Sequence, residues 1–269
     1  MSAGTRYPPM AWMTVAFLIL SGCNGGDSGP DTPDPDADSA IIIDHDTVPL
    51  FGAVQSATCD YLRANCRVYY GHTSHGSQIV TGMQMLAAEN GTYALPTLTE
   101  LSDDLGTAGD ISWVAPTRAW LDAHPDACEL VMWSLCGGVS ENTPEGIDIY
   151  LNAMADLETD YPDVVFVYMT GHLDGTGDAG NLKARNDQIR AWCRDHDKVL
   201  FDFADLESHD PAGTYYPDET DACTWCADWC ATHDCPDCAS CAHSHCFNCY
   251  RKGQAFWVLL ARLAAEGRV

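Results

Sequence analysis

The stretch VVFVYMTGH, residues 164–172, contains the clearest strand in the sequence. Residues 164–169 are β-branched or aromatic almost throughout, which is typical of a strand that is buried on both faces. The strand ends at Gly171-His172, and on both sides the chain alternates between helical and strand-like segments. This alternation predicts an α/β fold, in which helices cover both faces of a central parallel sheet.

The neighbouring segments extend this pattern in both directions. A hydroxyl N-cap and a proline at Thr143-Pro144 predict the start of a helix that ends near residue 161. The same criteria predict strands at 66–70, 129–135 and 198–203; helices at 51–65, 78–89, 117–123, 181–195 and 252–265; and a loop-rich stretch at 97–116.

Polar residues gather where the predicted strands end. His72, Thr73, Ser74 and His75 follow one strand, residues 136–138 (Cys-Gly-Gly) follow the next, and residues 172–174 and 202–207 follow two more. Ligands of parallel sheets bind beyond the carboxyl ends of the strands. The sequence therefore predicts a functional site at this edge.

The order of these parts resembles the SGNH or GDSL-like hydrolase superfamily, whose members are mostly esterases and deacylases. Ser74 follows the first long strand, Gly137 and Gly138 follow a middle strand, and His243 and His245 precede the last helix. The resemblance covers about residues 66 to 265. It implies a three-layer sandwich with a central parallel sheet, SGNH or flavodoxin-like, and a cysteine-rich insertion before the C-terminal helix.

The resemblance also implies roles for these residues. Ser74 takes the place of the nucleophile, His243 or else His245 that of the base, and Gly137 and Gly138 that of the oxyanion donors. A serine hydroxyl needs such a base, and the tetrahedral oxyanion needs hydrogen-bond donors. The motif departs from that of the family, because Gly-His-Thr-Ser replaces Gly-Asp-Ser and an aspartate three residues before the histidine is missing.

Other polar residues at this edge have alternative roles. His72 and His75 can line the pocket or orient a substrate, or they can form structural hydrogen bonds. His172 and Asp174 are candidates for substrate contact, since they follow the strand at 164–169. A second interpretation is a metal-dependent hydrolase with ligands from His72, His75, His172 and His243.

The chain has 14 cysteines, and eight of them lie between residues 223 and 249. In an exported protein they predict disulfides that stabilise a segment without a core of its own. The alternative is structural zinc, because three Cys-x-x-Cys pairs have the spacing of zinc ligands. These possible ligands are Cys223, Cys226, Cys235, Cys238, Cys246 and Cys249.

The N-terminal part predicts export and lipid anchoring. Residues 1–22 have the pattern of a lipoprotein signal peptide, and Leu20-Ser21-Gly22-Cys23 resembles a bacterial lipobox with Cys23 as the lipidated residue. A plain secretory signal is the alternative. Residues 23–40 predict an Asp/Pro/Gly linker, and residues 41–269 a single domain whose cysteine-rich segment spans 220–250. The expected location is the bacterial cell envelope.

The net charge of −26 argues against nucleic acid and anionic membrane surfaces as partners. The membrane is then contacted through the lipid anchor only. The expected function is a lipid-anchored serine hydrolase that acts on a small acyl ester or an O-acyl group, for example of surface glycans. That mechanism requires no cofactor. The alternative is a non-catalytic or metal-binding surface lipoprotein.

Overall fold

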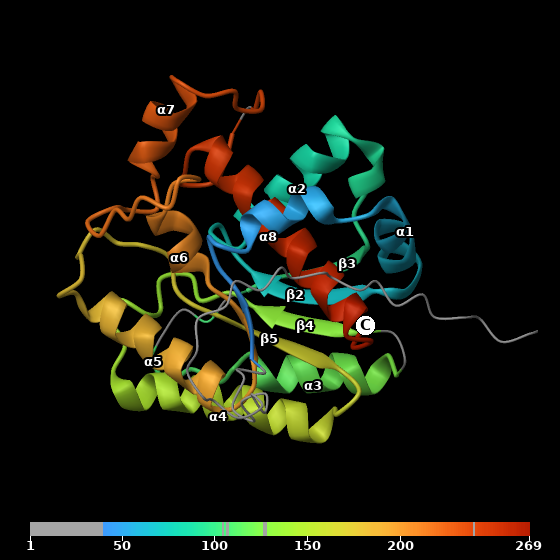
Figure 1. The fold of residues 1–269 in the computed structure, drawn as a ribbon. Helices are drawn as coiled ribbons and strands as arrows, with labels where there is room; N and C mark the ends of the chain where they lie inside the picture. Colours follow the sequence, from blue (N-terminus) through green and yellow to red (C-terminus); the bar gives the residue numbers. More distant parts are fainter. Residues whose placement is uncertain (1–39, 104, 106–107, 126–127, 239) are drawn as a thin grey trace, which may run out of the picture. The chain divides into compact units, whose positions relative to one another are not determined.

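A parallel sheet forms the centre of the protein (Figure 1). The computed structural model describes residues 40–103, 105, 108–125, 128–238 and 240–269. Within these ranges the sheet has six strands in the order β1-β6-β5-β4-β2-β3. Their bounds are Ile41–Ile43 (β1), Arg67–His72 (β2), Thr97–Ser102 (β3), Leu130–Trp133 (β4), Val165–Met169 (β5) and Val199–Phe201 (β6). All neighbouring strands are parallel, which confirms the predicted fold class.

The expected N-terminal features lie outside the described residues. These are the signal peptide at 1–22, the lipidated Cys23 and all of the linker except Ala40. In the part of the chain that the structure describes, no helix is long and apolar enough to cross a bilayer.

Helices cover the sheet on both faces (Figure 1). The strands alternate between two cores: Val165 and Val167 of β5 belong to one, whereas Phe166 and Tyr168 belong to the other. The first core is completed by α1 (Ser56–Asn65), α2 (Ser77–Glu89) and α8 (Cys246–Ala265). The second is completed by α3 (Val114–Ala123), α4 (Pro144–Asp160) and α5 (Asn181–Asp195). Burial on both faces explains the apolar runs of the central strands.

The edge strands were not predicted. The stretch at 97–116 was expected to be loop, yet β3 occupies Thr97–Ser102 and pairs with β2 along its whole length. Its residues are exposed or half-buried, so its composition is polar. β1 is only three residues long. The helix expected at 51–65 is also divided, because a 3₁₀ helix (Val48–Ala53) ends before α1 begins.

The cysteine-rich segment extends into the first turn of α8 and is cross-linked by disulfides, as predicted. Within the described residues these are Cys223–Cys226, Cys230–Cys235, Cys238–Cys246 and Cys241–Cys249. All six proposed zinc ligands are therefore engaged in disulfides. The segment contains the short helix α7 (Thr224–Cys230) and a small core around Trp225 and Phe247.

Two glycines allow α2 and α8 to pack in close contact. A Cβ atom at Gly82 would lie 1.8 Å from the backbone oxygen of Cys249, and one at Gly253 would lie 2.3 Å from the backbone carbon of Gly82. Neither neighbour can rotate away, because both are backbone atoms. The absence of side chains at these positions fixes the distance between the two helices.

We predict that Gly253→Ala destabilises the protein by about 1–3 kcal/mol, because the added methyl forces α8 away from α2. The measurement is the free energy of unfolding in urea. Gly52→Ala is the matched control, since a Cβ there meets no atom within 4 Å. Equal stability of the two variants would contradict the proposed close packing.

Candidate functional site

Loops at the carboxyl edge of the sheet bring three side chains together. His75 lies in the turn between β2 and α2, and Cys136 lies three residues after β4. Asp221 comes from the start of the cysteine-rich segment, where its backbone N–H donates to the carbonyl of Leu173. We refer to His75, Cys136 and Asp221, with the neighbouring Ser74, as the Cys136 site.

Hydrogen bonds connect these residues in a line. Cys136 Sγ lies 2.8 Å from His75 Nδ1, and His75 Nε2 lies 2.9 Å from Asp221 Oδ2. A carboxylate can only accept, so His75 donates from Nε2 and its Nδ1 accepts from the thiol. A thiol, a histidine and an orienting carboxylate in this order form the arrangement that activates a cysteine nucleophile.

The protonation of His75 suits this role. Burial lowers the pKa of His75, and the hydrogen bond to Asp221 opposes that effect in part. Near pH 7 the imidazole is therefore neutral and can accept the thiol proton. Burial raises the pKa of two other free cysteines, that of Cys66 to about 12 and that of Cys128 to about 11. In the described part of the chain no histidine is bonded to either of these thiols, so both are less reactive than a thiol with a base.

Backbone amides beside Cys136 can serve as oxyanion donors. Gly137 is exposed, and a Cβ there would meet nothing within 4 Å, so space is open next to the sulfur. Among the described residues, no acceptor is bonded to the N–H of Gly137 or of Gly138. Cys136 itself is 7% exposed. The N–H of the exposed Gly137 is therefore a candidate oxyanion donor beside the thiol, whereas Gly138 is buried.

His75, His172 and Asp221 could also hold a metal ion. One ligand atom from each lies within 4.8 Å of the others. The His75 and His172 rings stack with centroids 3.7 Å apart. His172 donates from Nδ1 to the carbonyl of Leu173 at 2.9 Å, which leaves Nε2 with a free lone pair. A histidine oriented in this way is typical of metal ligands.

The predicted nucleophile Ser74 belongs to this site and the predicted base His243 lies beside it, but the two are not bonded to each other. Ser74 Oγ is 3.8 Å from Cys136 Sγ, and no hydrogen bond joins Ser74 to His243 in the described part of the chain. The exposed His243 stacks on His75 with a centroid separation of 4.7 Å. His245 caps α8, where its Nδ1 accepts from the N–H of Phe247.

The other predicted residues have local partners. His72 Nε2 lies 2.9 Å from Glu100 Oε1 and links β2 to β3, which is a structural role. Asp174 Oδ1 accepts from the N–H and the hydroxyl of Thr176. Burial would raise the pKa of Asp174, but hydrogen bonds from Ser140 and Thr176 outweigh it and the pKa is lowered.

A buried ion pair holds the surrounding elements together. Lys252 Nζ lies 2.6 Å from Glu207 Oε1, and both side chains are 0% exposed. Lys252 also donates to Gln78, whose amide in turn donates to the carbonyl of Ala242. Burial lowers the pKa of Lys252 to about 8, against the opposing charge of Glu207. The pair thereby links α8 to α2 and to α6 (Phe203–Ser208).

No family model matches the sequence, and no curated protein is significantly similar to it. The site must therefore be understood from its own geometry. The sequence pattern indicates only a backbone role for Cys136 and contains no signal for Asp221. The available signal for Cys136 was its position at a strand end, directly before two glycines.

We predict that iodoacetamide modifies Cys136 faster than Cys66 or Cys128 in the native protein, since only Cys136 has a histidine to accept its proton. His75→Ala should slow the modification at least about 10-fold. Peptide mass spectrometry after timed quenching measures each rate. His72→Ala is a control outside the site. Equal rates at the three cysteines, or no effect of His75→Ala, would contradict the assignment.

Proposed function

We propose that this protein is an acyl hydrolase with Cys136 as its nucleophile. The observation that carries this proposal is the line from the thiol through His75 to Asp221, with distances of 2.8 and 2.9 Å. The position of the site supports it, because parallel sheets bind ligands at this edge. The resemblance to SGNH hydrolases also favours acyl chemistry, although the nucleophile then comes from a different loop.

The residues act in a defined order in this mechanism. His75 Nδ1 accepts the thiol proton as Cys136 Sγ attacks the carbonyl carbon of the substrate, and the amides of Gly137 and Gly138 stabilise the oxyanion. Asp221 stabilises the imidazolium. His75 then donates the proton to the leaving alcohol, which produces a thioester. Finally, water attacks the thioester as His75 accepts its proton, the carboxylic acid is released, and His75 returns the proton to the sulfur of Cys136.

The substrate class that we propose is a small acyl ester or an O-acyl group, for example of surface glycans. We further propose that the protein is exported and anchored through a lipid on Cys23, at the bacterial cell envelope. The four disulfides support export, because such cross-links persist in oxidising compartments.

Two other mechanisms have specific support. Ser74, the nucleophile expected from the resemblance, lies in the same site, 3.8 Å from Cys136 Sγ. The ligand atoms of His75, His172 and Asp221 favour a metal-dependent hydrolase. A metal ion bound at His75 Nε2 would exclude the thiol mechanism. It would replace the hydrogen bond through which Asp221 orients the imidazole.

Hydrolysis of 4-nitrophenyl acetate by single variants separates the three mechanisms. We expect Cys136→Ala and His75→Ala to lower kcat/KM at least about 100-fold, because they remove the nucleophile and its base. Ser74→Ala and His172→Gln should stay within about 10-fold of the wild type. kcat/KM should fall on acidification with a midpoint below about 6.5, since burial lowers the pKa of His75.

Each alternative gives a different result in this assay. Loss of activity in Ser74→Ala but not in Cys136→Ala would indicate the serine mechanism. Loss in His172→Gln and in the presence of a chelator, with recovery on adding Zn²⁺, would indicate the metal mechanism. No hydrolysis of any acyl ester by the wild type would contradict the proposed function and favour a non-catalytic surface protein.

A further inference from the structure

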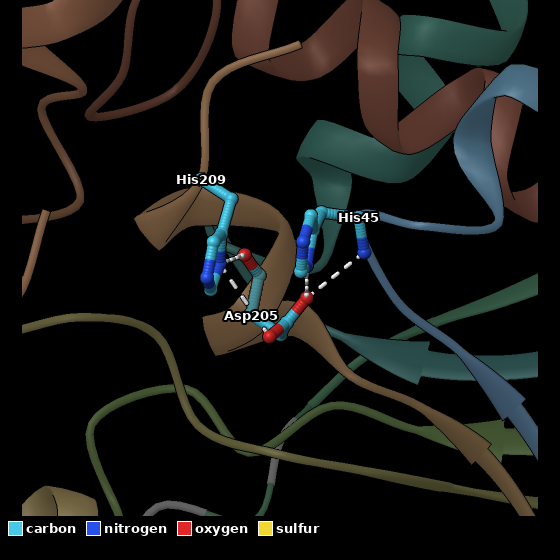
Figure 2. Close-up of side chains that lie close together, drawn as sticks. All are labelled: His45, Asp205 and His209. Atoms are coloured by element: carbon cyan, nitrogen blue, oxygen red, sulfur yellow. Dashed lines mark hydrogen bonds and ion pairs between the residues drawn. The ribbon is translucent and has the colours of Figure 1, made fainter. Parts of the chain in front are cut away.

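A second group of histidine and carboxylate side chains lies at the carboxyl ends of β1 and β6 (Figure 2). His45 follows β1, Asp205 belongs to α6, and His209 comes directly after α6. We refer to these three residues as the His45 cluster. The cluster shares no residue with the Cys136 site, so its function can be tested separately.

The three side chains converge closely (Figure 2). Asp205 Oδ1 accepts from the backbone N–H of His45 at 2.9 Å and lies 2.5 Å from His45 Nδ1. His209 Nδ1 is 3.5 Å from Asp205 Oδ2. The two imidazole rings stack with centroids 3.7 Å apart and an interplanar angle of 3°. One ligand atom from each residue lies within 4.8 Å of the others.

Hydrogen bonding leaves a free ligand atom on His209. Its Nδ1 lies 3.0 Å from the backbone carbonyl of Asp205 and 3.1 Å from Ser208 Oγ, and donation to the carbonyl leaves the lone pair on Nε2. Metal-binding histidines commonly donate their other ring N–H to a backbone carbonyl in this way. The three side chains are 14–20% exposed, so they are partly shielded from water and still accessible to an ion.

Acidic side chains outnumber basic ones along the adjoining cavity, where Arg190 pairs with Asp202. Asp46 Oδ1 lies 3.4 Å from His45 Nε2, and the half-buried Asp44 directly precedes His45. Among the described residues, no lysine or arginine forms an ion pair with Asp205. A cavity of about 380 Å³, lined in part by Asp44, Asp205 and His209, adjoins the cluster. A bound cation would offset this charge.

We propose that His45, Asp205 and His209 bind a divalent transition-metal ion. Two imidazole nitrogens favour such ions over Ca²⁺ and Mg²⁺, which take oxygen ligands almost exclusively. Metal–ligand bonds of about 2.0–2.2 Å require the side chains to move closer by small rotations. Three protein ligands leave one coordination position for water or for a ligand in the adjoining cavity. β1 then has a functional role, because it positions His45 beside Asp205 of α6.

The test is isothermal titration calorimetry, in which Zn²⁺ is added to the chelator-treated full chain and the number of bound ions is measured. We expect His209→Gln and Asp205→Asn each to bind one Zn²⁺ fewer than the wild type. His172→Gln is the matched control: it alters the other possible metal-ligand group and must leave this equivalent of Zn²⁺ bound. Circular dichroism confirms that each variant is folded, and Asp205→Asn changes the ligand without changing its shape.

The proposal is overturned if the wild type binds no Zn²⁺, or if neither His209→Gln nor Asp205→Asn changes the stoichiometry. Titration with Co²⁺ gives a second readout, since its visible absorption reports on nitrogen and oxygen ligands. This spectrum should disappear in His209→Gln and persist in His172→Gln. The reverse pattern would assign the ion to His75, His172 and Asp221 and would also contradict the proposal.

Discussion

The buried ion pair between Lys252 and Glu207 is the constraint on which the arrangement of the site depends. Neither side chain is exposed, and removing one partner of such a pair typically costs about 3–5 kcal/mol. The pair holds α8 against α6, Lys252 reaches Gln78 at the start of α2, and Glu207 accepts from the N–H of Leu173 at 2.7 Å. The loops that carry His75 and His172 are therefore positioned by one network.

The cysteine-rich segment completes the site from outside the sheet. It has only a small core, and its disulfides join it to the first turn of α8 through Cys246 and Cys249. From this position it supplies Asp221 and places His243 against the ring of His75. The sheet thus provides the thiol and the base, and the cross-linked segment provides the carboxylate that orients the base.

The sequence was sufficient for the central fold but not for the site. Buried strands such as Val165–Met169 were predictable because they are apolar on both faces, whereas the polar edge strand Thr97–Ser102 has no such pattern. The strand ends correctly indicated where polar side chains would gather. Their partners were not predictable, since His75 lies 61 residues from Cys136 and 146 residues from Asp221, and loop geometry alone brings them together.

The central claim is that Cys136 attacks the substrate with His75 as its base. The most direct measurement is mass spectrometry of the protein after it is mixed with 4-nitrophenyl acetate and quenched in acid within its first turnovers. We expect one acetyl group per chain, located on the peptide that contains Cys136 and released by hydroxylamine at neutral pH, as a thioester is. An acetyl group on Ser74 instead, or turnover without any acetylated Cys136, would contradict it.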